Sequence, residues 1–200
     1  MREFPPPARP VPPPPLALPA TQSVTVLGAG PDTLYGPLLD ERIIMINGEI
    51  DETVAHRVTA QLLLLAARDP RRDITLYVHS PAGTATAGLA VLDVMRWVPP
   101  DVATCAVGVA GSVGQMLVTA GAAGKRTALA HARLRLLRAA GDARPDVLEA
   151  QRRELAAVTA AGTGQTVEQV VADSAAGRWF TAAEAVEHGL VDAVSSAPDG

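Results

Sequence analysis

A serine stands between two glycines in the segment "GVAGSVGQML", residues 108–117. The apolar run at residues 102–109 predicts a buried strand, and a helical pattern begins at Ser112. A serine at such a junction gains from the positive end of the new helix, and neighbouring backbone N–H groups can form an oxyanion hole. The motif alone leaves two interpretations open, a catalytic nucleophile and a serine that caps a helix in a tight turn.

A second glycine-bearing turn, "SPAG" at residues 80–83, ends another predicted strand, residues 73–80. Parallel strands deliver their carboxyl ends to one edge of a sheet, so we expect this turn to share a crevice with Ser112. A nucleophilic serine also needs a base. The segment "ALAHARLRLLRAAG" runs through the strand predicted at residues 126–137, and its end offers only Leu and Arg where a base might be expected.

Short β-branched runs alternate with longer helical patterns from about Leu34, which predicts βα units around a mostly parallel sheet. Asp51 is expected to cap a helix, and "TAAE" at residues 181–184 is expected to open another through a capping box. The other predicted elements are a strand at residues 42–48 and helices at residues 84–97, from 112, and from 145.

The composition predicts one domain with two tails. Two hundred residues, 48% of them hydrophobic, can bury one sizeable core. Nine of the seventeen prolines fall in residues 5–19, a composition typical of polyproline II. We therefore divide the chain into a Pro-rich disordered tail, a linker or axial segment, a folded domain and a C-terminal tail, at residues 1–20, 21–33, 34–194 and 195–200.

Charge and cysteine content argue against several classes of function. The chain has 21 acidic and 17 basic residues and no basic cluster dense enough to track a phosphate backbone, which argues against nucleic acid as a partner. The lone Cys105 lies in an apolar run, which predicts a buried side chain and suits a reducing compartment. No apolar stretch of about 18 residues is present. We expect a soluble cytoplasmic protein without a metal.

Residues from about Tyr35 to Val194 resemble the proteolytic subunit of the bacterial Clp protease, an α/β protein of the related crotonase-like fold. The resemblance rests on the segments "LLDERIIMINGEID", "QLLLLAARDP", "DITLYVHSPAGTATAGLAVLDVM", "PDVATCAVGVAGSVGQMLVTAGAAGKR" and "FTAAEAVEHGLVD". It implies a serine-peptidase ancestry and seven-membered rings, two of which stack around a closed degradation chamber. It also implies a partner unfoldase that alone uses ATP, so this chain needs no cofactor.

The same resemblance assigns the catalytic positions. The family's nucleophile falls on Ser112, and its oxyanion donors fall on the backbone N–H groups of Gly83 and Val113. The family's catalytic histidine and aspartate fall on Leu137 and Gly177. A serine hydroxyl without a base is protonated and weakly nucleophilic, so we expect Ser112 to be nearly inert.

No other histidine fits the missing role. His131 lies six residues before position 137 on the same predicted strand, which at about 3.3 Å per residue is roughly 20 Å away. His56, His79 and His188 match positions that are not catalytic in the family, and we expect them to be surface or packing residues.

Other departures from the family concern assembly. Ala175 and Ala176 stand where an acidic residue and an arginine help lock ring to ring. The handle segment between Leu137 and Gly164 is shorter by about two and a half helical turns. Both changes argue against back-to-back stacking of rings.

The family's hydrophobic cleft for the unfoldase falls on Tyr77 and Trp97, with Thr75 and Thr127 where aromatics are usual. Aromatic side chains supply much of the anchoring energy in such clefts, so we expect weakened docking.

The leading hypothesis is a non-catalytic structural or regulatory ring subunit that co-assembles with an active paralogue. One alternative is an active ATP-dependent serine endopeptidase subunit whose base comes from elsewhere after assembly. Another is a crotonase-like binder of acyl-CoA, since that fold shares the oxyanion hole. A fourth interpretation, in which every motif serves packing alone, does not explain the ordered match over so many segments.

Overall fold

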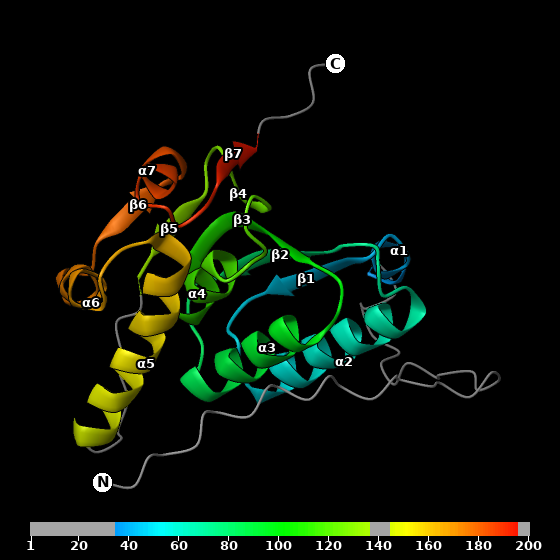
Figure 1. Ribbon diagram of the computed structural model, residues 1–200, viewed down its shortest axis with the longest axis horizontal. Coiled ribbons are helices and arrows are strands. Elements are labelled where there is room, and N and C mark those ends of the chain that lie inside the picture. The colour runs from blue at the N-terminus through cyan, green and yellow to red at the C-terminus, as the bar shows by residue number, and fades with distance from the viewer. Residues whose placement is uncertain (1–34, 137–144, 196–200) are drawn as a thin grey trace, which may run out of the picture.

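A computed structural model describes residues 35–136 and 145–195, which form a sheet covered by helices (Figure 1). The strands are β1 (Ile43–Asn47), β2 (Ile74–Ser80), β3 (Val102–Gly111), β4 (Arg126–Leu129), β5 (Arg133–Arg135), β6 (Trp179–Thr181) and β7 (Ala193–Ser195). The helices are α1 (Gly36–Asp40), α2 (Glu52–Arg68), α3 (Ala85–Trp97), α4 (Val113–Thr119), α5 (Pro145–Thr163), α6 (Val167–Ala176) and α7 (Ala182–Glu187).

The sheet is mostly parallel, as the sequence predicts. Its strand order is β1-β2-β3-β4-β7 with parallel pairing throughout. β5 continues alongside β3 in parallel and pairs with β6 in antiparallel orientation. The α/β fold class is therefore confirmed.

Local sequence rules account for the ends of the helices. The Asp51 side chain accepts a hydrogen bond from the Val54 N–H and begins α2. Thr181 and Glu184 exchange side-chain and backbone hydrogen bonds in the predicted capping box of α7.

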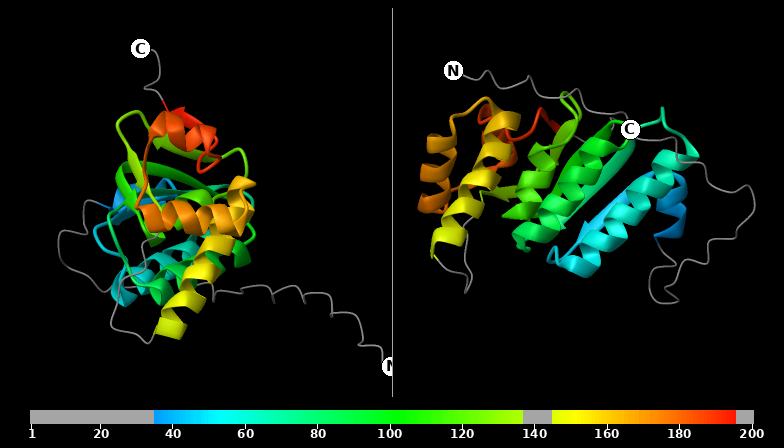
Figure 2. Two further views of the ribbon diagram at one scale, coloured as in Figure 1. Left: turned by 90° about the vertical axis from the view of Figure 1, so that its left-hand side faces the viewer. Right: turned by 60° about the horizontal axis from the view of Figure 1, so that its bottom comes forward.

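Helices α2 and α3 lie side by side over one face of the sheet (Figure 2). The alternating residues of β2 follow this arrangement: Ile74, Leu76 and Val78 are buried, and Thr75, Tyr77 and His79 are half-buried on the other face.

The single strand predicted at residues 126–137 is wrong. A turn at residues 130–132 separates β4 from β5, and the two strands pair with different parts of β3. Between those parts Gly108 has φ +65°, His79 Nδ1 lies 3.2 Å from the Val109 nitrogen, and the register of β3 against β2 shifts, so β3 carries a bulge there. The 20 Å estimate for His131 assumed an unbroken strand and does not hold in that form.

Other boundaries also differ from the predictions. α1 and α6 are not predicted from the sequence, and β7 ends at Ser195, one residue inside the predicted C-terminal tail. The predicted tail at residues 1–20, the segment at 21–33, residues 196–200 and Leu137 lie outside the described residues. In the part of the chain that the structure describes, no helix is long and apolar enough to cross a membrane.

Candidate active site

Ser112 lies at the turn between β3 and α4 in an uncommon backbone conformation, with φ 56° and ψ −126°. Its backbone N–H donates to the Arg135 carbonyl at 3.0 Å. Its side chain makes no capping hydrogen bond to α4. The helix-cap interpretation is therefore not supported, while a strained strand-to-helix turn is typical of an exposed nucleophile.

The turn that contains Gly83 packs directly against the Ser112 turn. A β-carbon at Gly83 would lie 2.6 Å from Val113 Cγ2 and 2.7 Å from the Ile50 carbonyl oxygen. A β-carbon at Gly111 would lie 2.6 Å from the Pro81 carbonyl oxygen. The structure thus brings "SPAG" and Ser112 to one edge of the sheet, as predicted. The first N–H groups of a helix have no intrahelical acceptor, which leaves the Val113 N–H available; the oxyanion role of Gly83 and Val113 stays a prediction.

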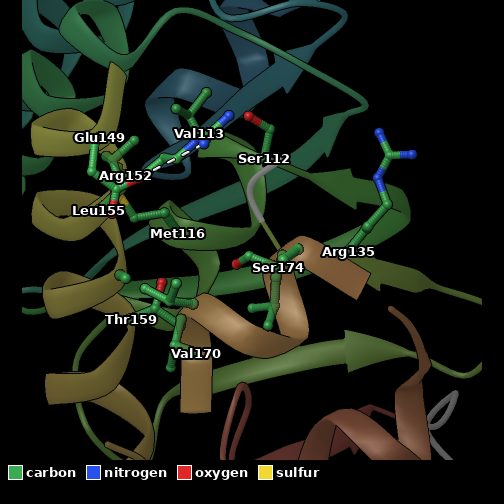
Figure 3. Close-up of a pocket in the computed structure, with 14 residues that line it drawn as sticks. Ser112, Val113, Met116, Arg135, Glu149, Arg152, Leu155, Thr159, Val170 and Ser174 are labelled. Atoms are coloured by element: carbon green, nitrogen blue, oxygen red, sulfur yellow. Dashed lines mark ion pairs between the residues drawn. The ribbon is translucent and has the colours of Figure 1, made fainter. Parts of the chain in front are cut away.

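A pocket of about 700 Å³ opens beside Ser112 (Figure 3). Ser112 and Val113 form one end, and α5 and α6 supply much of the remaining wall. The lining residues are Ser112, Val113, Met116, Arg135, Leu136, Glu149, Arg152, Leu155, Ala156, Thr159, Val170, Val171, Ser174 and Ala175. Sequence reasoning missed the residues from α5 and α6, because only the helical periodicity after Pro145 marked α5 and nothing placed either helix against Ser112.

None of the four histidines of the chain lines this pocket, and all four lie within the described residues. His56 is exposed on α2, and His131 is exposed in the turn between β4 and β5. The His79 Nδ1 is 2.9 Å from a backbone carbonyl of β3, and the His188 ring packs 4.7 Å from that of Phe180. Their surroundings are those of surface and packing residues.

The backbone conformation at position 177 by itself favours a glycine. It adopts φ +65° and ends α6 as a left-handed C-cap, a position that favours glycine. It lies two residues before Trp179, which pairs with Arg135 of β5. A β-carbon added at Gly177 would meet no atom within 4 Å. Space for a larger side chain therefore exists beside the end of β5.

Arg126 fixes the far ends of the helices that carry the pocket wall. Its guanidinium donates to carbonyls of Thr119 at the end of α4 and of Gly162 in α5. It also donates to both carboxylate oxygens of Asp192, just before β7. These hydrogen bonds from Arg126 hold the pKa of Asp192 below its ordinary value. One mostly buried cation thus joins three elements behind the pocket.

Tyr77 and Trp97 stand on different sides of the sheet. Tyr77 is half-buried on the β2 face away from α3, between Met45 and Cys105 in the strand register. Trp97 is 42% exposed at the end of α3. Cys105 is buried, as predicted, and burial raises the pKa of its thiol. The role of Tyr77 and Trp97 in docking an unfoldase stays a prediction.

Comparison with known proteins defines the class of this molecule. The model of the Clp protease family matches residues 28–198. ATP-dependent Clp protease proteolytic subunit 1 of Corynebacterium jeikeium is 46% identical over 172 residues, which cover 82% of this chain and 92% of that relative. Subunit 2 of Rhodococcus jostii is 47% identical over 174 residues, covering 82% and 89%, and subunit 3 of Streptomyces coelicolor is 46% identical over 172 residues, covering 82% and 79%.

The chain belongs to the Clp protease family. Its mixed α/β architecture is that of a Clp proteolytic subunit.

Proposed function

We propose that this chain is a Clp proteolytic-subunit homologue that keeps the nucleophile position but lacks the base that would activate it. The observation that carries this proposal is that none of the four histidines lines the pocket of Ser112. The sequence adds Leu137 and Gly177 at the positions where the family has its histidine and aspartate. Loss of the triad in a serine peptidase lowers turnover about a millionfold, and the residual rate is roughly 10³ to 10⁴ times that of the uncatalysed reaction in water. Chemistry at Ser112 is then negligible.

The role that follows is structural or regulatory, in a ring shared with an active paralogue. The relatives carry the numbers 1, 2 and 3 in their names, which supports the existence of paralogous subunits with which this chain could share a ring. The folded unit at residues 34–194 supplies the ring contacts, and Tyr77 and Trp97 supply a weakened surface for an unfoldase that consumes ATP. The protein acts in the cytoplasm and has no metal or cofactor of its own.

The test is labelling of Ser112 by a fluorophosphonate probe. The purified full chain, alone and mixed with an active paralogue, should label no faster than the Ser112→Ala variant. Intact-mass measurement separates labelling of this chain from labelling of the paralogue. A labelling rate at Ser112 near that of an active subunit would overturn the proposal.

A second candidate is an active ATP-dependent serine endopeptidase, because the Glu149 carboxylate lines the same pocket as Ser112. Glu149 forms ion pairs with Arg152 at 3.7 Å and Arg153 at 3.8 Å. This candidate requires peptide hydrolysis that disappears in both Ser112→Ala and Glu149→Gln. Hydrolysis that survives either substitution comes from another source.

The third candidate, a binder of acyl-CoA, is not favoured by the family match. Retention of the full chain on immobilised CoA, competed by free CoA, is the result that it requires.

A further inference from the structure

An arginine stacked on a tryptophan stands next to Ser112. Arg135 of β5 and Trp179 of β6 are direct partners in the strand register, and the guanidinium carbon of Arg135 lies 4.8 Å from the centre of the Trp179 ring. Trp179 is 48% exposed. Arg135 also lines the Ser112 pocket, and its carbonyl accepts the hydrogen bond from the Ser112 N–H. Arg135 therefore belongs to the wall of the pocket, and Trp179 is the ring that it stacks on.

The charge of Arg135 has no anionic partner in the described part of the chain. Its Nε is buried without a hydrogen-bond acceptor, and no carboxylate among the described residues forms an ion pair with it. A guanidinium held against an aromatic ring is a preorganised fork of donors. The acceptor that fits this fork best is a carboxylate, which can take two parallel hydrogen bonds.

The other side of Ser112 has an apolar part, next to the ion pair of Glu149 and Arg152 on α5. Figure 3 shows Ser112 between Arg135 and α5, with Met116, Leu155 and Val170 on the side away from Arg135. An extended polypeptide advances about 3.3 Å per residue and turns successive side chains to opposite sides. A chain that crosses Ser112 can therefore place an apolar side chain in the pocket and a neighbouring side chain at Arg135.

We propose that this pocket binds extended polypeptide segments in which Asp or Glu lies within about two residues of an apolar residue. The apolar side chain enters between Met116 and Leu155, and the carboxylate pairs with Arg135 above Trp179. This inference rests on the proposed function only in that the segment is held without being cut. The apolar side chains of Met116 and Leu155 favour a polypeptide over a nucleic acid as the ligand, because a nucleic acid has no aliphatic side chain to place against them.

The experiment uses the full chain and fluorescein-labelled peptides of equal length. One peptide carries a single Leu flanked by Glu, a second replaces each Glu with Gln, and a third replaces each Glu with Lys. Fluorescence anisotropy should show that the Glu peptide binds about tenfold more tightly than the Gln peptide, as expected for hydrogen bonds to a charged group. The difference should shrink as salt is raised.

The substitution Arg135→Gln should abolish the preference for Glu. The matched control is Arg71→Gln, which removes an exposed arginine between α2 and β2 and should leave the preference unchanged. Equal binding of the Glu and Gln peptides to the wild-type chain would overturn the proposal without any variant. Tighter binding of a single-stranded oligonucleotide than of the Glu peptide would overturn it as well.

Mass spectrometry of the peptides after incubation separates this proposal from the proposed function. Cleaved peptide with the Glu preference intact refutes the non-catalytic role alone. Uncleaved peptide without a Glu preference refutes the acidic-segment site alone.

Discussion

Replacing Ser112 with glycine should stabilise the protein, because Ser112 has φ 56° in a conformation that favours glycine. A non-glycine residue held there costs about 1–3 kcal/mol. Glycine also raises the conformational entropy of the unfolded chain, which lowers the free energy of unfolding by about 0.4–1 kcal/mol. The Ser112 hydroxyl makes no capping hydrogen bond, so its removal loses little. The net expected gain in unfolding free energy is about 1 kcal/mol.

A gain of this size corresponds to a rise in melting temperature of about 2–4 °C for a chain of this length. The measurement is thermal unfolding followed by circular dichroism, with urea unfolding as a second probe. The matched control is Ser112→Ala, which removes the hydroxyl but keeps the β-carbon and the strain, and should lie within about 0.5 kcal/mol of wild type. A glycine variant no more stable than the alanine variant would refute the claim that the turn is strained.

Three further predictions concern the surroundings of the site. Asp192→Asn should destabilise the protein by about 2 kcal/mol at neutral pH, because Arg126 loses its carboxylate partner. Arg126 lowers the pKa of Asp192, so the stability that this carboxylate contributes is full above about pH 4 and is lost as the pH falls through the lowered pKa. The free energies of unfolding of the two proteins, measured in urea, should therefore converge in acid. Gly83→Ala should destabilise by about 1–3 kcal/mol in the same assay, because the new β-carbon would lie 2.6 Å from Val113 Cγ2; an unchanged midpoint would contradict the close packing of the two turns. Cys105 should react with a thiol reagent only as fast as the protein unfolds, because it is buried and its thiol pKa is raised; rapid labelling of the native chain would contradict its burial.

The features that sequence reasoning predicts well are local. Asp51 and Thr181 cap their helices through groups three residues away, so the pattern is visible in a short segment. The end of α3 follows from Pro99 and Pro100 in the same way.

The features that it misses depend on distant parts of the chain. β4 and β5 look like one strand in the sequence, but they pair with separate parts of β3, on either side of the bulge near Gly108. The wall of the Ser112 pocket comes from α5 and α6, and no local pattern places Glu149 or Ser174 beside a residue so far away in sequence. The strained φ of Ser112 is equally invisible, since serine is not a residue that the sequence marks for that conformation.

The left-handed glycine at the end of α6 bears on how readily this lineage could change its chemistry. Gly177 has open space around it, and aspartate is among the residues that tolerate that backbone conformation with modest cost. A carboxylate could thus arise there by one substitution without rebuilding the neighbouring helix. At this position, the fold itself is no barrier to a carboxylate.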